Sequence, residues 1–387
     1  MTFRKSIFWC HLAAGLTAGV IIAIMSVTGI AIAFEEEILR WYDRQVSRLD
    51  RDAGKGNVPL PIAELTDKIQ TAHAGAKVSS FAMFSQPGRA WEVHLGDEGP
   101  FYLDPFTGST QASLAHDAHE VIHKLEEWHR WLGASDGLTS TGRVVTGISN
   151  LALVVLCVTG LYLWFPRRWN WRALRPLLLL KPGSKGKARD FNWHNVFGFW
   201  ALPFVLVLSV TAVVISFEWG HRLVFILVGE EPPKSRTYGM MAVPPPVVLP
   251  PAPEAPPAPL DKAFARIAAA FPDWESITLE AIPDPAGSPL EPLEFGVTVP
   301  DSMPSRAYIP VKSHPFTGEI LQQVRLQERS PGLQARVWIR FLHTGAAFGL
   351  RGKAVASLAT AAVLVLVWTG FALSWRRFLR KSRSQAV

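Results

Sequence analysis

The sequence has almost no cysteine and few charged residues. Its two cysteines, Cys10 and Cys157, form no CxxC or CxxCH motif, which excludes a zinc or iron–sulfur site held by cysteines and a covalently attached c-type haem. Neither a Rossmann-type nor a Walker-type glycine loop occurs, so no nucleotide phosphate site is evident. Charged residues make up only 18% of the 387 residues, against about 25% in typical soluble proteins. The composition therefore argues against an ordinary cytoplasmic enzyme.

Four long stretches of the chain contain no Asp, Glu, Lys or Arg. At about 1.5 Å per residue, each stretch is long enough to cross a hydrocarbon core of about 30 Å. We therefore predict four transmembrane helices. The first is too long for the apolar part of a signal peptide, and Glu35, Glu36 and Glu37 follow it directly, so we expect a retained anchor. The uncharged stretches are residues 6–34, 144–166, 191–217 and 354–375.

Basic residues are concentrated on one predicted side of the membrane. Residues 1–6, 166–193 and 376–387 hold 15 of the 39 Lys and Arg residues but only one of the 32 acids, Asp190. Because basic segments stay in the cytoplasm, we expect both termini and the central loop there, with the two long connecting segments outside. The orientation of the chain in the membrane accounts for these basic runs, so we expect no nucleic-acid partner. We also expect the basic segments to contact membrane lipid.

The spans repeat one sequence plan. The motif HxxxG begins at His11 in the first span and at His194 in the third, and a threonine follows each histidine 17 residues later. In the second and fourth spans, a step of 17 residues leads from a glycine to Thr159 and Thr369. We interpret the threonines and their following glycines as packing devices, with Thr bonding to its own helix and Gly permitting a close contact. The chain is thus predicted to consist of two repeats of span, outer lobe, span.

Each outer segment is predicted to form an α+β lobe. In the first, LPIAELTDKIQTAH is helical, and KVSSFAMF and RAWEVHL alternate as strands do. The second has the helical PLDKAFARIAAAF followed by ESITLEA, LEFGVTV and SRAYIPV, and both contain a PFTG turn. Nine of the 18 residues in 242–259 are proline, which predicts a stiff extended linker. The predicted fold class is an α-helical membrane protein, a four-transmembrane-helix bundle with two outer α+β lobes.

These patterns divide the chain into nine segments. The membrane helices are placed at residues 7–34, 143–165, 194–217 and 353–375. The cytoplasmic parts are residues 1–6, 166–193 and 376–387. The outer segments are residues 35–142, with the first lobe and an amphipathic His-rich helix, and residues 218–352, with the linker and the second lobe.

Histidine is the strongest chemical candidate, because polar groups near the membrane interior are costly and usually face the bundle. His11 and His194 lie near the cytoplasmic ends of their spans, whereas His129 and His343 precede the second and fourth spans on the outer side. Two imidazoles facing each other can ligate one haem iron. The pattern predicts two candidate haem sites. The alternative is that each histidine is an interfacial or helix-bonding residue, and the sequence leaves the pairing open.

A second group of histidines precedes the second span. His116, His119 and His123 are spaced so that they share one helical face with two following glutamates. This face is either a metal or substrate-entry surface or the solvated side of an amphipathic helix. His221, after the third span, is a further candidate that has no counterpart in the repeat. The histidines expected to be structural or surface residues are His73, His94 and His314.

The combination of HxxxG, WHRWLG ahead of Gly142-Arg143, two PFTG segments and Thr-Gly near the span ends resembles the PepSY-associated transmembrane family over nearly the whole chain. The size and layout are most similar to bacterial inner-membrane ferric-siderophore reductases of the FoxB type. The resemblance implies PepSY-like periplasmic lobes and two b-type haems. It also implies electron transfer from the cytoplasmic side to a ferric siderophore. Some relatives carry a fused flavin reductase domain that this chain lacks, so an unidentified cytoplasmic or membrane electron donor is implied.

Two other functions remain open at this stage. PepSY lobes could act as binding or inhibitory modules, which would make the chain a cofactor-free sensor or regulator of a periplasmic protein or protease. A siderophore or metal permease is the third possibility, although four spans are few unless the chain dimerises. For the haem arrangement, the aromatic side chains expected to pack around the macrocycles are Phe199, Trp200 and Trp368.

Overall fold

The computed structural model describes residues 2–49, 58–73, 77–96, 99–134, 141–166, 169–233, 259–280, 291–300 and 302–384. The chain forms two compact units, each built from separated parts of the sequence. The predicted proline-rich linker lies outside the described residues except for Pro259. We call the first of the two compact units the membrane unit; it comprises Met1–Glu35, Glu120–Pro232 and Ala335–Val387. We call the second the sheet unit; it comprises Glu36–His119 and Pro233–Gln334.

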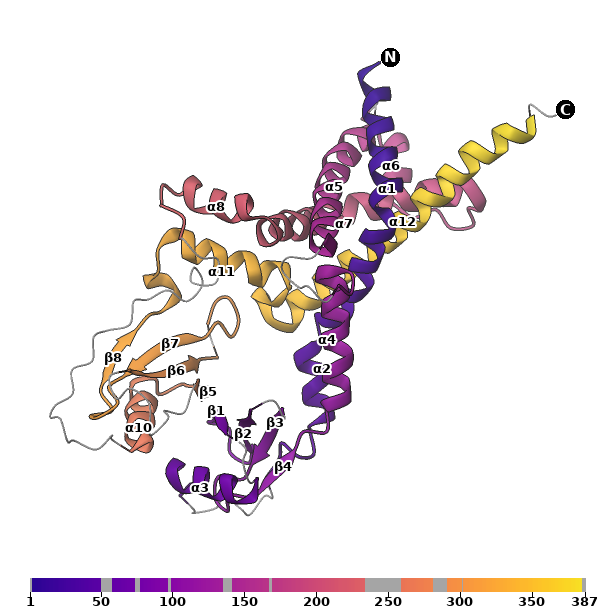
Figure 1. Ribbon diagram of the computed structural model, residues 1–387. Helices are drawn as coiled ribbons and strands as arrows, with labels where there is room; N and C mark the ends of the chain where they lie inside the picture. The colour runs from indigo at the N-terminus through magenta and orange to yellow at the C-terminus, as the bar shows by residue number, and fades with distance from the viewer. Residues whose placement is uncertain are drawn as a thin grey trace. The chain divides into compact units, whose positions relative to one another are not determined.

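The membrane unit contains four helices that are long and apolar enough to cross a membrane, as the sequence predicts. The helices are α1 (Phe3–Ile32), α5 (Thr141–Trp164), α7 (Gly186–Ser216) and α12 (Gly349–Ser384) (Figure 1). Helix α7 starts before the predicted boundary at residue 194, and α12 extends beyond residue 375. The uncharged stretch marks only the part inside hydrocarbon, whereas a helix continues wherever its backbone bonds remain satisfied.

The four long helices pack as a closed ring. The neighbours are α1 with α5, α5 with α7, α7 with α12, and α12 with α1. Helices α1 and α7 therefore occupy diagonal positions. Small side chains fill much of the centre, including Ala18, Ala201, Ala359 and Ala362. Small residues allow close helix approach, which is how helices associate in lipid without a hydrophobic driving force.

Shorter helices flank the membrane spans. Helix α4 (His116–Trp131) precedes α5, and α11 (Pro331–His343) precedes α12. Helix α6 (Trp171–Leu178) packs on α7, and α8 (Glu218–Leu227) follows it. Asn192 on α7 donates to the carbonyls of Pro176 and Leu179 at 2.7 and 3.0 Å, which fastens α6 to the span. Two short 3-10 helices, Leu326–Glu328 and Ala346–Phe348, precede α11 and α12.

The sheet unit holds one eight-stranded antiparallel sheet in the order β4-β3-β2-β1-β5-β6-β7-β8. The two lobes expected from the sequence are therefore halves of a single sheet, joined where β1 pairs with β5 in the register Phe81 opposite Leu279. The strands are β1 (Val78–Phe84), β2 (Trp91–Leu95), β3 (Pro100–Leu103), β4 (Thr110–Ala112), β5 (Ser276–Leu279), β6 (Leu293–Thr298), β7 (Ile309–Ser313) and β8 (Ile320–Gln323).

Two helices cover one face of this sheet. Helix α3 (Ile62–Ala72) buries Leu65 and Ile69, and α10 (Leu260–Ala270) buries Ile267. These side chains share one core with the alternate, inward-facing residues of the strands, as the period-two pattern predicts. The Asp261 carboxylate also accepts the backbone N–H of Ile62 at 2.9 Å, which ties the start of α3 to α10.

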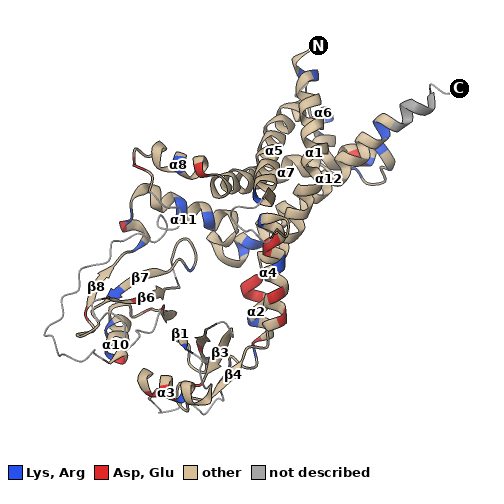
Figure 2. Cartoon of the chain, in the orientation of Figure 1, with Lys and Arg blue, Asp and Glu red and all other residues tan. Residues whose placement is uncertain are grey.

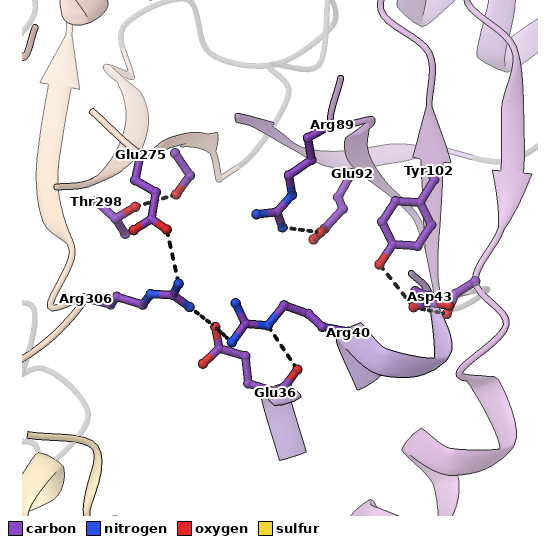
Figure 3. A network of polar contacts seen from close by, with 11 residues as sticks. Glu36, Arg40, Asp43, Arg89, Glu92, Tyr102, Glu275, Thr298 and Arg306 are labelled. Carbon is purple, nitrogen blue, oxygen red and sulfur yellow. Dashed lines mark hydrogen bonds and ion pairs between the residues drawn. The ribbon is translucent and has the colours of Figure 1, made fainter. Parts of the chain in front are cut away.

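A buried carboxylate organises the first half of the sheet unit. Asp43 follows α2 (Glu35–Tyr42), and its side chain accepts the Tyr102 hydroxyl at 3.0 Å and the Ser113 hydroxyl at 2.8 Å (Figure 3). It also accepts the backbone N–H groups of Leu114 and Ala115 at 2.7 and 3.1 Å. Burial, together with nearby carboxylates, raises the pKa of Tyr102, so this hydroxyl stays protonated and donates.

Arg306 joins the two halves of the sheet unit through ion pairs. Figure 3 shows Arg306 between Glu36 and Glu275, which belong to the first and second halves. Its distance to Glu275 is 3.1 Å, and Arg40 also contacts Glu36 at 3.2 Å. Arg306 has a φ of 59°, which is unusual for a residue with a side chain.

Candidate functional site: two histidine pairs

The helix bundle brings the four predicted histidines together in two pairs. His11 on α1 and His194 on α7 lie on diagonal helices, and their ring centroids are 6.4 Å apart. His129 near the end of α4 and His343 at the end of α11 form the second pair, also with centroids 6.4 Å apart. The sequence predicted these four residues but left their pairing open. We call the pairs the inner pair (His11 and His194) and the outer pair (His129 and His343).

The two pairs lie at opposite ends of the bundle. His129 contacts Met25 and Thr28 on α1, whereas His11 is near the start of the same helix. The 17 residues from His11 to Thr28 correspond to roughly 25 Å of helix. The pairs are therefore separated by most of the thickness of a membrane.

In the inner pair, each imidazole is held by a threonine of a neighbouring helix. The Nδ1 atom of His11 lies 2.8 Å from the hydroxyl of Thr159 on α5, and that of His194 lies 2.9 Å from the hydroxyl of Thr369 on α12. Each of these threonines donates its own proton to the carbonyl four residues earlier, at 2.6 and 2.7 Å. A hydroxyl has one proton, so both oxygens accept from histidine, and Nδ1 is the protonated nitrogen.

In the outer pair, backbone carbonyls impose the same tautomer directly. His129 Nδ1 lies 2.9 Å from the carbonyl of Met25, and His343 Nδ1 lies 3.1 Å from that of Leu208. A carbonyl only accepts, so these Nδ1 atoms also carry the proton. The hydroxyls of Thr28 and Thr211 lie beside the same nitrogens at 3.2 and 3.4 Å.

The hydrogen bonds leave the Nε2 lone pair of each imidazole available. Two neutral imidazoles whose Nε2 atoms both carry lone pairs cannot hydrogen-bond to each other through those atoms. A metal ion between them satisfies both. With an imidazole–metal bond of about 2 Å on each side, and each ring centroid roughly 1 Å behind its nitrogen, the expected centroid separation is about 6 Å. The observed 6.4 Å in both pairs fits one metal ion in each.

Burial keeps the outer histidines neutral, which is the form that binds metals. His129 and His343 lie on α4 and α11, outside the four long helices. Burial, followed by repulsion from His343, lowers the pKa of His129 to about 4. Burial also lowers the pKa of His343. Both rings are therefore uncharged near neutral pH and able to offer a lone pair.

Glycines make room for two of the rings. A Cβ atom at Gly29 would lie 2.9 Å from Cε1 of His129, and one at Gly160 would lie 3.3 Å from Cε1 of His11. A Cβ atom at Gly370 would lie an ordinary 3.8 Å from His194, and the fourth position is Ala212, beside Thr211. The Thr28-Gly29 and Thr159-Gly160 steps therefore combine a hydrogen bond to a histidine with space for its ring, which goes beyond the packing interpretation of the sequence.

The sequence does not identify the four threonines as partners of the histidines. Their interpretation as helix-bonding residues is correct, because all four donate to their own helix at 2.6 to 2.8 Å. Their contacts with histidine depend on which helices are neighbours. The available signal was the repeated 17-residue step, which places a polar group at the opposite end of each span. The four residues are Thr28, Thr159, Thr211 and Thr369.

The other candidate histidines lie apart from the two pairs. His116, His119 and His123 are exposed on α4, and His123 lies 3.6 Å from Glu127. His221 is buried on α8, with its ring against Phe225. His73 and His94 bond to the hydroxyls of Thr110 and Ser80, as expected for structural residues.

The three aromatic residues expected to pack around a macrocycle do not share one environment. Phe199 stacks on Trp164 with ring centroids 4.3 Å apart. Trp200 is 60% exposed and donates to the carbonyl of Leu178, and Trp368 is 65% exposed. The expectation that these two tryptophans pack around a macrocycle therefore stays a prediction. They lie on outward faces of their helices, where indole suits the membrane interface.

Two further patterns occur around α4. Residues 119–123 read HEVIH, a spacing that zinc peptidases use for two ligands and a general base. A catalytic zinc takes three protein ligands, and the described part of the chain has no group of three His, Cys, Asp or Glu side chains arranged for a metal. Residues 133–137 read GASDG, the spacing of a serine nucleophile elbow. Such an elbow follows a strand, whereas α4 precedes this segment, and Ser135 lies outside the described residues.

The fold and site define a class: a four-helix membrane protein with two half-buried histidine pairs and an antiparallel sheet unit. The family comparison agrees with this class. The model of the PepSY-associated TM region matches residues 8–377, so the chain belongs to that family. A search among curated proteins gives no match.

Proposed function

We propose that this chain is a dihaem b-type membrane oxidoreductase that reduces ferric iron held by siderophores. The observation that best supports this proposal is the geometry of the two histidine pairs. Each site has two imidazoles whose ring centroids are 6.4 Å apart. In each ring Nδ1 is hydrogen-bonded, which leaves Nε2 able to bind a metal. One such site lies at each end of the bundle. That arrangement suits two redox centres that pass electrons across a membrane.

The residues of each pair fit a haem with two axial histidines. A bound haem supplies one-electron chemistry at its iron. His11 and His194 would hold the inner group, and His129 and His343 the outer one. Thr159 and Thr369 orient the inner rings through Nδ1, and the carbonyls of Met25 and Leu208 orient the outer rings. Such partners fix the tautomer of a ligating histidine and increase its basicity.

The charge asymmetry supports an orientation. The basic segments support the proposal that both termini and the 166–193 loop lie in the cytoplasm of a bacterial cell, with the sheet unit in the periplasm. The inner pair would then hold the redox group on the side of a cytoplasmic or membrane donor. The outer pair would hold the one at the periplasmic face. The two PepSY-like halves of the sheet unit are proposed as outer lobes of a duplicated chain.

The proposed substrate follows from coordination chemistry. Siderophores hold ferric iron through hard oxygen ligands, and ferrous iron binds such ligands less well. One-electron reduction of the complexed iron therefore weakens its binding and releases it for uptake. The sheet unit would provide the surface that meets the ferric siderophore.

The test is an optical spectrum of the detergent-purified full chain, oxidised and then reduced with dithionite, with haem quantified per chain. We expect a b-type spectrum and about two haems per chain, one for each histidine pair. Re-oxidation of the reduced protein by ferric siderophores then tests the substrate class. One haem would restrict the proposal to a single pair. A colourless, folded protein from a haem-replete host would overturn it and favour the cofactor-free regulator.

The histidine variants assign the sites. His129→Ala combined with His343→Ala should remove one haem and leave the chain inserted in the membrane. His11→Ala combined with His194→Ala should remove the other. His73→Ala is a matched control, because that ring bonds to Thr110 in the sheet unit and lies in neither pair. Unchanged haem content in either double variant would contradict the assignment of that pair.

A further inference from the structure

The outward face of α12 carries an apolar groove. Its volume is about 290 Å³, and it is lined by Trp368, Phe371, Ala372, Trp375 and Arg376. Trp368 and Trp375 are 65% and 69% exposed. At about 100° per residue, Trp368 and Trp375 point away from the buried Ala359 and Ala362, whereas Arg376 lies two turns after Thr369 on the same side of the helix. The two indoles of the groove therefore open toward the membrane.

The lining determines what the groove accepts. Four of its five residues are apolar, and two are indoles at i and i+7 on the same helix face. On a membrane-spanning helix, this surface meets lipid chains rather than water. A linear hydrocarbon chain lying between the indoles covers such a face, and indole itself favours the boundary between hydrocarbon and headgroups.

Positive charge in excess lies at one end of the groove. Arg376 contacts Asp190, a carboxylate that is only 1% exposed, and Arg189 contacts the same carboxylate at 3.0 Å. Two guanidinium groups thus share one negative charge. The next residue, Arg377, stacks over Phe8 and Trp9 at 4.6 and 5.2 Å. Figure 2 shows basic residues along this end of α12 and near the start of α1.

We propose that this groove is a binding site for one anionic phospholipid of the leaflet that contacts the basic segments. An acyl chain lies along Trp368, Ala372 and Trp375, and the phosphate meets the surplus charge at Arg376. Charge complementarity selects the anionic headgroup, because Asp190 neutralises only one of the two arginines that it contacts. The proposal depends on neither haem nor siderophore chemistry.

The test measures lipid retained by the full chain. The purified protein is placed in nanodiscs with equal amounts of phosphatidylglycerol and phosphatidylcholine of identical acyl chains, and the retained lipids are counted by native mass spectrometry. Wild type should retain phosphatidylglycerol preferentially. Ala372→Trp fills the groove without changing a charge and should abolish that preference. Leu358→Trp is the matched control, because Leu358 is 73% exposed on the same face of α12, four turns away.

A second pair of variants tests the charge. Arg376→Gln should reduce the phosphatidylglycerol preference roughly fivefold, as expected for one basic residue near an anionic headgroup. Arg376→Lys keeps the charge and should keep the preference. Equal retention of both lipids by wild type, or unchanged phosphatidylglycerol in Ala372→Trp, would overturn the proposal. A retained quinone in place of phospholipid would also overturn it and assign a different occupant.

Discussion

The Nδ1 atom of His11 lies 2.8 Å from the hydroxyl oxygen of Thr159, and among the described residues this hydroxyl is its only hydrogen-bond partner. Both histidines of the outer pair have backbone partners as well, at Met25 and Leu208. The tautomer of His11 therefore depends on one side chain. This makes Thr159 more sensitive to substitution than the threonines of the outer pair.

Replacing Thr159 with Val should impair the inner site selectively. The variant keeps the shape of the side chain but leaves a partly buried Nδ1–H without an acceptor. We expect this to lower the free energy of unfolding by about 1 kcal/mol. Moving the proton to Nε2 would relieve this cost and remove the lone pair needed for ligation. Under the proposed function, haem content should fall from about two to about one per chain, measured by pyridine haemochrome and by reduction potential.

Two controls separate this effect from general destabilisation. Thr159→Ser retains the hydroxyl and should keep the inner site. Thr28→Val removes a hydroxyl at 3.2 Å from His129, but the carbonyl of Met25 at 2.9 Å remains. The outer site should therefore persist in that variant. Equal loss in Thr159→Val and Thr28→Val would contradict the special dependence of His11.

The bundle and its four histidines could be predicted from sequence because their signals are local. Runs without charge identify the spans, and the repeated spacing singles out the histidines. The hydrogen-bond partners could not be predicted in the same way. Thr28 lies on the same helix as His11 but contacts His129, whereas His11 contacts Thr159 on another helix. Those contacts depend on which helices pack as neighbours.

In the sheet unit, too, the local elements could be predicted from the sequence, whereas the contacts between distant segments could not. Alternating patterns predicted strands in both outer segments, because alternation reflects one buried face. The pairing of β1 with β5 joins Phe81 to Leu279, residues distant in the sequence, and local alternation holds no information about such a partner. Asp43 was likewise not predicted, because a single aspartate after a helix gives no sign that Tyr102 and Ser113 will surround it.

Gly29 should tolerate no side chain. A Cβ atom there would lie 2.9 Å from Cε1 of His129, closer than real Cβ contacts, so Gly29→Ala should displace the ring. Haem content and the spectrum of the outer site should change under the proposed function. Gly15→Ala is the matched control on the same helix, because its Cβ would meet Leu156 at an ordinary 3.7 Å. Identical spectra for both variants would show that the close approach at Gly29 is unimportant.

Replacing Asp43 should destabilise the sheet unit. The carboxylate is buried and accepts four hydrogen bonds, as Figure 3 shows in part. Asp43→Ala leaves several hydrogen-bond donors unsatisfied, and we expect the free energy of unfolding of the sheet unit to fall by about 3 kcal/mol. Hydrogen exchange at the amides of Leu114 and Ala115 should become much faster. Asp67→Ala, an exposed substitution on α3, is the control and should leave exchange unchanged.

Glu280 should make the sheet unit less stable as pH rises. Glu280 is exposed, but partial desolvation beside the sheet, followed by repulsion from Glu294, raises the pKa of its carboxyl above the usual 4.5. An acid with a raised pKa binds its proton more tightly in the folded state, so its stabilising contribution is complete below the unfolded pKa and is lost as pH rises through the folded pKa. Glu280→Gln should therefore raise the melting temperature slightly at pH 7 to 8, and the gain should disappear near pH 4. Glu64→Gln on α3 is the control, because Glu64 pairs with Lys68 and Glu280 is repelled by Glu294. Thermal unfolding followed at several pH values checks this, and a gain that stays constant between pH 4 and pH 8 would show that ionisation of Glu280 is not its cause.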